Sequence, residues 1–421
     1  MIYDIACLRS TGSRIITPNE SLYLVDFYND YLDKRDKNYL RKKKDFFLYL
    51  FGFFGEQKKF QNALGYIDTF VREKYILDVI SKRTHPLNKY DIDIQREFYE
   101  ATGYSTDDYA SLLFLVWCYF TKGKVSSALT NEIIQIKNPL FKIENIRNIV
   151  QKYSTTIEEL TCNQLKRQGL YSKPFIKIGD EYVASNPFLV LSLFSNCLYW
   201  VVRNVYLEKK SQHFINAFGA YFEIYVEEVL ENCLSHGKYH KVEESKKEKR
   251  ADWILNVGDF TIIIEQKSAI AAIEAKQNHP DLELMKKYMK NNWGEAIKQL
   301  HSTQISENIK KCIKIILVYE DYYKSECIDE VFSLDDLPEN DGTYWLISIN
   351  EFEMLLDTYR SDPSLGLKII EEKLFAETNK ANDGRELIGF LSKNGISKNN
   401  YIKNFNIDSD YKKMKKKIFA E

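Results

Sequence analysis

The sequence predicts a mixed α+β or α/β protein in two parts, a mainly helical half over residues 1–207 and an α/β domain over residues 213–421. Three observations lead to this prediction. A chain of 421 residues is too long for a single ordinary core. Apolar residues recur at three- and four-residue spacing up to about Leu207, whereas after Gln212 the pattern changes to helix, three strands, helix and strand. The short polar stretch Tyr206–Gln212 is the expected linker.

The first half is expected to serve recognition or partner binding. A helix over Ile143–Tyr153, a second over Thr156–Gln168 and a hairpin around Gly179-Asp180 meet the requirements of a winged helix-turn-helix over residues 143–184. The same order of elements also occurs in plain helical domains, so both interpretations stay open. After the hairpin, Asn186 is expected to cap a helix whose first residue is Pro187.

The second half begins with a long helix and continues with alternating strands and helices. The expected elements are helix Phe214–Leu234, strands Tyr239–Glu243, Ala251–Asn256 and Phe260–Lys267, helix Asn291–His301, and strands Ile313–Tyr319 and Tyr344–Ile349. The last strand leads into a helix for which Asn350 and Glu353 have the spacing of a capping box.

Composition and charge limit the classes of function. Hydrophobic residues at 44% and charged residues at 28% are typical of a globular protein. The net charge is -1, so any surface that binds nucleic acid must be local. The seven cysteines are scattered without a CxxC pair, which argues against a disulfide framework or a thiolate zinc site. The first residues lack the apolar segment of a signal peptide, and the apolar stretches are too short or interrupted to span a bilayer. We therefore expect a cytoplasmic protein that does not enter a membrane.

The hairpin that follows Arg250 carries the chemistry. Gly258-Asp259 has glycine at the first central position of a two-residue turn, as a type II′ hairpin requires. This register places Asp252 opposite Glu265, with Lys267 on the same face, and directs the alternating apolar side chains to the other face. A three-residue loop would instead separate the two carboxylates. An Ile-rich strand argues against the alternative that these residues form only a surface ion pair.

Two carboxylates at cross-strand distance repel each other and are stabilised by a hard divalent cation between them. Mg²⁺, or Mn²⁺ in its place, suits such all-oxygen ligation. A bound ion can polarise a phosphodiester oxygen and activate a coordinated water. Lys267 adds a positive group that orients the water or stabilises charge at phosphorus. The pattern predicts metal-dependent hydrolysis of a phosphodiester.

The same stretch resembles a known family of enzymes. Gly219-x-x-Phe222-Glu223-x-Tyr225-Val226, followed by Arg250-Ala251-Asp252-Trp253 and Ile263-Ile264-Glu265-Gln266-Lys267, is similar to the PD-(D/E)xK, or restriction-endonuclease-like, nuclease superfamily. The resemblance covers Phe214 to Glu320 and implies an αβββαβ core with a mixed central sheet. It implies that Asp252, Glu265 and the backbone carbonyl of Gln266 bind the metal and that Lys267 and Glu223 complete the catalytic group. Ala251 replaces the proline that often precedes the aspartate.

Residues beside this hairpin are expected to contact the substrate. Lys249 and Arg250 end a basic run that leads into the strand of Asp252, which suits a polyanion, although such a run can also be a solubilising loop. Gln299 resembles a polar residue that some family members direct at the site, or it is an ordinary exposed glutamine.

The expected function is therefore that of a Mg²⁺-dependent endonuclease acting on DNA. By the resemblance, a role in restriction or anti-phage defence is expected. A nuclease must be controlled in its own cell, which favours a homo-oligomer or a regulatory protein partner. The alternative is a catalytically silent nuclease-fold module that binds nucleic acid or a partner protein.

Overall fold

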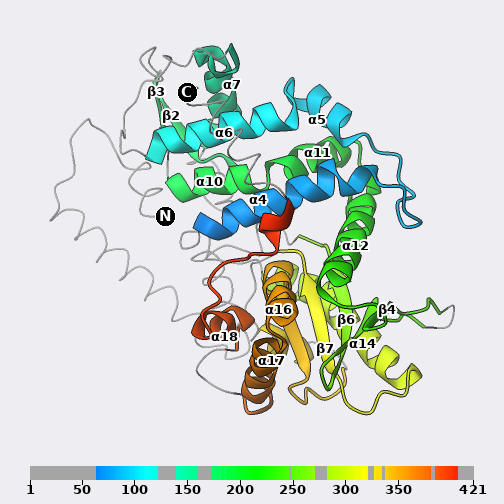
Figure 1. The fold of residues 1–421 in the computed structure, drawn as a ribbon. Helices are drawn as coiled ribbons and strands as arrows, with labels where there is room; N and C mark the ends of the chain where they lie inside the picture. Colours follow the sequence, from blue (N-terminus) through cyan, green and yellow to red (C-terminus); the bar gives the residue numbers. More distant parts are fainter. Residues whose placement is uncertain are drawn as a thin grey trace.

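The computed structural model describes a mixed α/β protein. It covers residues 63–121, 139–156, 158–159, 172–179, 181–184, 186–245, 248–270, 282–320, 327–333, 337–380 and 385–405. The described helices of the first half gather at one end of a five-stranded sheet, which belongs to the second half (Figure 1).

The helices of the first half pack on one another through their apolar residues. They are α4 (Ala63–Asp78), α5 (Ile94–Thr102), α6 (Thr106–Thr121), α7 (Ile143–Lys152), α10 (Pro187–Ser195) and α11 (Cys197–Glu208). Asn186 caps α10 as predicted, since its side chain accepts the Phe188 N–H at 2.8 Å and Pro187 follows in the first turn.

The region predicted as a winged helix contains a three-stranded sheet. Strand β1 (Ser154–Thr156) runs parallel to β2 (Phe175–Ile178), which pairs antiparallel with β3 (Glu181–Ala184) across the predicted hairpin. The predicted helix start at Thr156 is wrong, because this residue ends β1. Residues 158 and 159, the part of the predicted helix that the structure describes after Thr156, are helical. Most of that second helix lies outside the described residues, so the winged-helix interpretation stays a prediction.

The large sheet has the strand order β4-β5-β6-β7-β8. Its strands are β4 (Tyr239–Lys241), β5 (Trp253–Val257), β6 (Phe260–Lys267), β7 (Ile313–Val318) and β8 (Tyr344–Ser348). The pairs from β4 to β6 are antiparallel, whereas β6, β7 and β8 are parallel. The sheet is therefore mixed, as predicted.

Helices cover both faces of this sheet. They are α12 (His213–Cys233), α13 (Leu282–Met289), a π-helical turn (Lys290–Gly294), α14 (Glu295–Ser306), α15 (Cys327–Phe332), α16 (Ile349–Ser361), α17 (Pro363–Thr378) and α18 (Leu387–Lys393). One face packs on α12 and α16, and the opposite face packs on α13 and α14. The helix predicted over Asn291–His301 is thus an interrupted helix that starts earlier and ends later.

A single apolar cluster joins the two halves of the chain. Phe70 and Leu113 of the helical half belong to the same buried cluster as Phe222 of α12 and Ile264 of β6. A second, smaller cluster fills the space between the sheet and α14. The predicted division near Tyr206–Gln212 stays a prediction, and the larger core crosses it.

The expected capping box is displaced by two residues. Ser348, not Asn350, caps α16, because its hydroxyl accepts the Glu351 N–H and the Glu351 side chain returns to the Ser348 N–H. Glu353 is fully buried and bonds Arg72 of α4 at 2.6 and 2.7 Å. Glu353, which the local pattern assigned to the cap, is thus bound instead by Arg72, a residue far from it in the sequence.

Among the described residues, no single helix combines the length and the apolarity needed to cross a membrane. Helices α10 and α11 meet those criteria only when they are taken together, and they bend by 68° relative to each other. Val190, Leu191, Leu198 and Val202 of this pair are fully buried in the large core.

Candidate active site

The turn between β5 and β6 fixes the register of the site. Val257 pairs with Phe260, which leaves Gly258-Asp259 as the two-residue turn that the sequence predicts. Gly258 has a φ of 58°, in the region that favours glycine, and Asp259 is not among the residues with positive φ, as in a type II′ turn. A Cβ at Gly258 would also lie 2.5 Å from Leu367 Cδ2. The glycine is therefore favoured by its backbone conformation, and a larger residue would also require the Leu367 side chain to move.

A bulge at the start of β5 places Asp252. Regular pairing ends at Trp253, which is opposite Ile264, and the Asp252 N–H donates to the Ile264 carbonyl at 2.9 Å. Two residues of one strand thus face one residue of the other, which is the signature of a β-bulge. The Asp252 side chain then accepts the Gln266 N–H at 2.8 Å. The prediction that Asp252 forms a ladder pair with Glu265 is wrong, yet the bulge still directs the two carboxyl groups toward each other.

Lys267 and Gln299 complete a chain of polar contacts. Lys267 Nζ donates to Glu265 Oε1 at 2.5 Å and to Gln299 Oε1 at 3.0 Å. Gln299 lies on α14, and its Nε2 donates to the Arg250 carbonyl at 3.1 Å. The structure therefore brings Gln299 to the lysine, as the resemblance implies, and excludes the alternative of an unattached surface glutamine.

Thr303, which the sequence gives no reason to single out, holds the residue that precedes Asp252. The Ala251 N–H donates to Thr303 Oγ1 at 2.7 Å, and Thr303 Oγ1 donates to the Gln299 carbonyl at 2.9 Å. Thr303 is fully buried. Helix α14 therefore fixes both the start of β5 and the amide that contacts Lys267.

The two carboxyl groups lie in an environment that disfavours their charge. Burial raises the pKa of Asp252 well above its ordinary value, and the neighbouring charge of Glu265 raises it further. Burial also raises the pKa of Glu265, against the lowering effect of Lys267. Contact with the Asp252 carboxyl lowers the pKa of Glu265 too. That contact is favourable only while one of the two groups holds a proton, because two ionised carboxylates repel.

Glu223 approaches this pair from α12. Its negative charge raises the pKa of both Asp252 and Glu265, which places it in the same electrostatic site. Its Oε1 lies 2.5 Å from Lys241 Nζ on β4. Lys241 was not predicted as a site residue, because its contact depends on how α12 packs against the sheet and no local motif marks it.

The residues expected to bind substrate are placed differently from one another. The Lys249 side chain is 79% exposed, with its Nζ 4.0 Å from Glu295. Arg250 forms ion pairs with Glu248 at 3.1 Å and with Glu307 at 3.3 Å. Lys249 is therefore available at the surface, whereas Arg250 would have to exchange its partners to contact a phosphate.

The donor set fits a hard divalent cation. Asp252 and Glu265 are adjacent carboxyl groups, and Glu265 Oε2 is buried without a hydrogen-bond donor from the described residues. The Gln266 N–H donates to Asp252 at 2.8 Å, whereas the role of the Gln266 carbonyl as a metal ligand stays a prediction. No group of three or more His, Cys, Asp or Glu side chains within the described ranges is arranged around a common metal position. The fit thus rests on two carboxylates, whose negative charge a hard cation that prefers oxygen ligands would neutralise.

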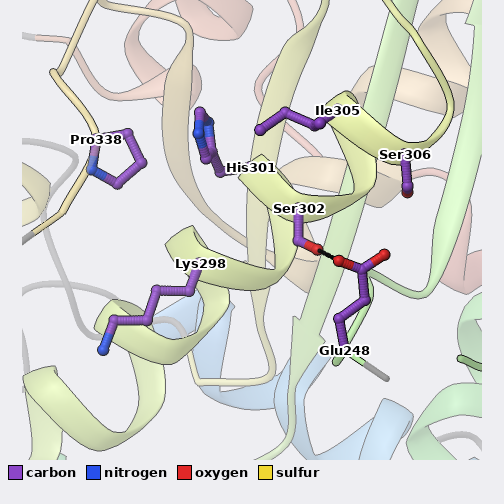
Figure 2. Close-up of a pocket in the computed structure, with 7 residues that line it drawn as sticks. All are labelled: Glu248, Lys298, His301, Ser302, Ile305, Ser306 and Pro338. Atoms are coloured by element: carbon purple, nitrogen blue, oxygen red, sulfur yellow. Dashed lines mark hydrogen bonds between the residues drawn. The ribbon is translucent and has the colours of Figure 1, made fainter. Parts of the chain in front are cut away.

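A separate pocket lies on the outer side of α14. It has a volume of about 400 Å³ and is lined by Glu248, Lys298, His301, Ser302, Ile305, Ser306 and Pro338 (Figure 2). Ser302 donates to Glu248 at 2.8 Å across this pocket. The pocket shares no residue with the predicted site. We place the candidate active site at the hairpin, because the half-buried Asp252 and the buried Glu265 repel each other there.

Replacing Asp252 by asparagine is expected to stabilise the metal-free protein at pH 8 by about 1–3 kcal/mol, the scale of a poorly compensated buried polar group. Asparagine keeps an oxygen for the Gln266 N–H and removes the charge. Because the pKa of Asp252 is raised on folding, the charge penalty is absent below about pH 4, grows as the pH rises toward the raised pKa, and is constant above it. Thermal unfolding with EDTA at several pH values measures the difference.

The matched control is Asp259→Asn in the exposed turn of the same hairpin, which should leave the stability unchanged at pH 8. A variant Asp252→Asn that is less stable than the wild-type protein at pH 8 would contradict the proposed charge penalty.

Comparisons of this chain with protein-family models, with curated proteins and with solved structures give no significant match.

Proposed function

We propose that this protein is a Mg²⁺-dependent nuclease that hydrolyses phosphodiester bonds, with DNA as the substrate. The observation that carries the proposal is the arrangement at the end of the β5–β6 hairpin. Asp252 and Glu265 meet there, Lys267 contacts Glu265, and Glu265 Oε2 has no donor among the described residues. Such an acidic pair, with Glu265 buried and Asp252 half-buried, costs stability unless a cation binds it.

Asp252 and Glu265 would hold the ion, with the backbone of Gln266 beside them. A bound divalent ion would supply Lewis acidity toward a phosphodiester oxygen and lower the pKa of a coordinated water. Lys267 is held by Glu265 and Gln299, so its ammonium is oriented before substrate arrives. It can donate a hydrogen bond to a phosphate oxygen as charge develops there. This orientation favours catalysis because the Lys267 ammonium does not have to reorient during the reaction.

The order of elements also supports the proposal. Helix α12, strands β4, β5 and β6, helix α14 and strand β7 follow one another as the resemblance to the PD-(D/E)xK nucleases implies, with α13 inserted before α14. Exposed Lys249 lies three residues before Asp252 and is suited to a phosphate neighbour along the substrate. The helical half supplies the surface through which we propose that a partner or a second copy controls cleavage, as in a restriction or anti-phage system.

The test is a cleavage assay with supercoiled plasmid, linear duplex DNA, single-stranded DNA and RNA, each with Mg²⁺, Mn²⁺ or EDTA. We expect cleavage of DNA by the wild-type protein and by Asp259→Asn, and a loss of at least about 10²-fold in Asp252→Asn. Equal cleavage by wild type and Asp252→Asn would refute the proposal. Salt-sensitive DNA binding without cleavage under any of these conditions would favour the silent binding module instead.

A further inference from the structure

We propose that Lys241 takes the place of a second metal ion, so that the site binds one divalent cation at Asp252 and Glu265 while Glu223 is neutralised by the Lys241 ammonium. This inference rests on the proposed nuclease function and concerns how many ions the site takes.

Lys241 is held in position by the sheet. It ends β4 and pairs with Trp253, the residue next to Asp252. Trp253 lies on the face that packs against α12, so Lys241 is directed at the helix that carries Glu223. The distance from Lys241 Nζ to Glu223 Oε1 is 2.5 Å. Because the Lys241 ammonium is attached to the neighbouring strand, its effective concentration at the Glu223 carboxylate is high. A free ion would have to compete with it.

Glu223 belongs to the same site as the other two carboxylates. Its ion-pair partner Lys241 pairs with Trp253, the residue next to Asp252. One turn earlier on α12, a Cβ at Gly219 would lie 3.5 Å from Oγ of Ser268, the residue next to Lys267. A second cation bound through Glu223 would therefore be close to the first. The position is already filled, however, because the structure places a lysine there.

The balance of charge favours one ion. With all groups ionised, the three carboxylates of Asp252, Glu265 and Glu223 face two ammonium groups, those of Lys241 and Lys267. One negative charge remains, and one divalent ion converts it to one positive charge, which matches a phosphodiester. A second divalent ion would leave three positive charges in a partly buried site, where repulsion between ions is weakly screened.

The two acidic positions also differ in their contacts. Glu265 is 4% exposed, and its Oε2 has no donor among the described residues. Glu223 is 19% exposed and has an ammonium partner. An incoming cation would thus find one carboxylate oxygen without a donor, on Glu265, and would have to displace Lys241 to bind Glu223.

The experiment counts ions without measuring cleavage. Mn²⁺ is titrated into the full-length protein, the free ion is followed by its electron paramagnetic resonance signal, and only sites lost in Asp252→Asn or in Glu223→Gln are counted. We expect one such ion per chain in the wild-type protein and in Lys241→Arg, and two in Lys241→Met. The double variant Lys241→Met with Glu223→Gln should return to one ion. A coupled Mn²⁺ pair should give its spectrum only in Lys241→Met.

Two outcomes overturn the inference while the nuclease proposal survives: two ions per wild-type chain, or one ion in a folded Lys241→Met variant, as judged by circular dichroism. The third outcome is that Asp252→Asn binds as many ions as the wild-type protein. It would refute the metal site at Asp252 and, with it, the proposed function.

Discussion

Replacing Lys267 by methionine is expected to reduce metal-dependent DNA cleavage by about 10²–10³-fold, the usual effect of removing one group that stabilises developing charge. Methionine keeps much of the length of the side chain and removes the ammonium that contacts Glu265 and Gln299. The rate of cleavage under single-turnover conditions with saturating Mn²⁺ measures the chemical step directly. Because Asp252 and Glu265 are unchanged, Mn²⁺ should still bind.

The same variant should move the pH profile. Lys267 lowers the pKa of Glu265, so its removal lets burial raise that pKa further. Glu265 then ionises only at higher pH, and Mn²⁺ binding should require a higher pH in Lys267→Met than in the wild-type protein. Lys298→Met on the outer side of α14 is the matched control and should change neither quantity. An unshifted Mn²⁺-binding profile in Lys267→Met would contradict the role assigned to the ammonium.

Replacing Arg72 by methionine is expected to lower the free energy of unfolding by about 3–5 kcal/mol, because it leaves a buried carboxylate without its counter-charge. Arg72 is 2% exposed and binds both oxygens of Glu353 at 2.6 and 2.7 Å. Glu353 also accepts the Tyr225 hydroxyl at 2.5 Å. Urea denaturation measures the loss from the midpoint and the slope.

Two controls separate the charge from the packing. The double variant Arg72→Met with Glu353→Gln removes the unpaired charge and should recover part of the lost stability. Arg96→Met breaks a 3.9 Å pair with Glu100, whose members are each about two thirds exposed, and should cost less than about 0.5 kcal/mol. A loss in Arg72→Met as small as that in Arg96→Met would show that the buried pair contributes little.

The strands around the site could be predicted from the sequence because their signals are local. Gly258-Asp259 between two alternating runs leaves few choices of turn, and the observed register follows from it. The Asp252 bulge could not be predicted in this way. It depends on the Ala251 N–H bonding to Thr303, a residue 52 positions later on α14.

The same limit explains the two other differences. Ser348-x-x-Glu351 and Asn350-x-x-Glu353 both fit the pattern of a capping box, and Arg72, 281 residues from Glu353, decides between them. Lys241 stands in a predicted strand, but its contact with Glu223 appears only when α12 packs on the sheet. Strands and turns that depend on neighbouring residues can be predicted from the sequence, whereas the partner of a side chain depends on tertiary packing.

The apolar cluster that passes from Phe70 and Leu113 into Ile264 has a consequence for how such a protein can change over evolution. Exchange of one half by recombination works where the junction is polar and tolerates new neighbours. A shared close-packed core does not tolerate new neighbours, because the side chains of one half pack closely against those of the other. New properties in the helical half would therefore arise by substitutions on its outer surface, and the two halves would be inherited together.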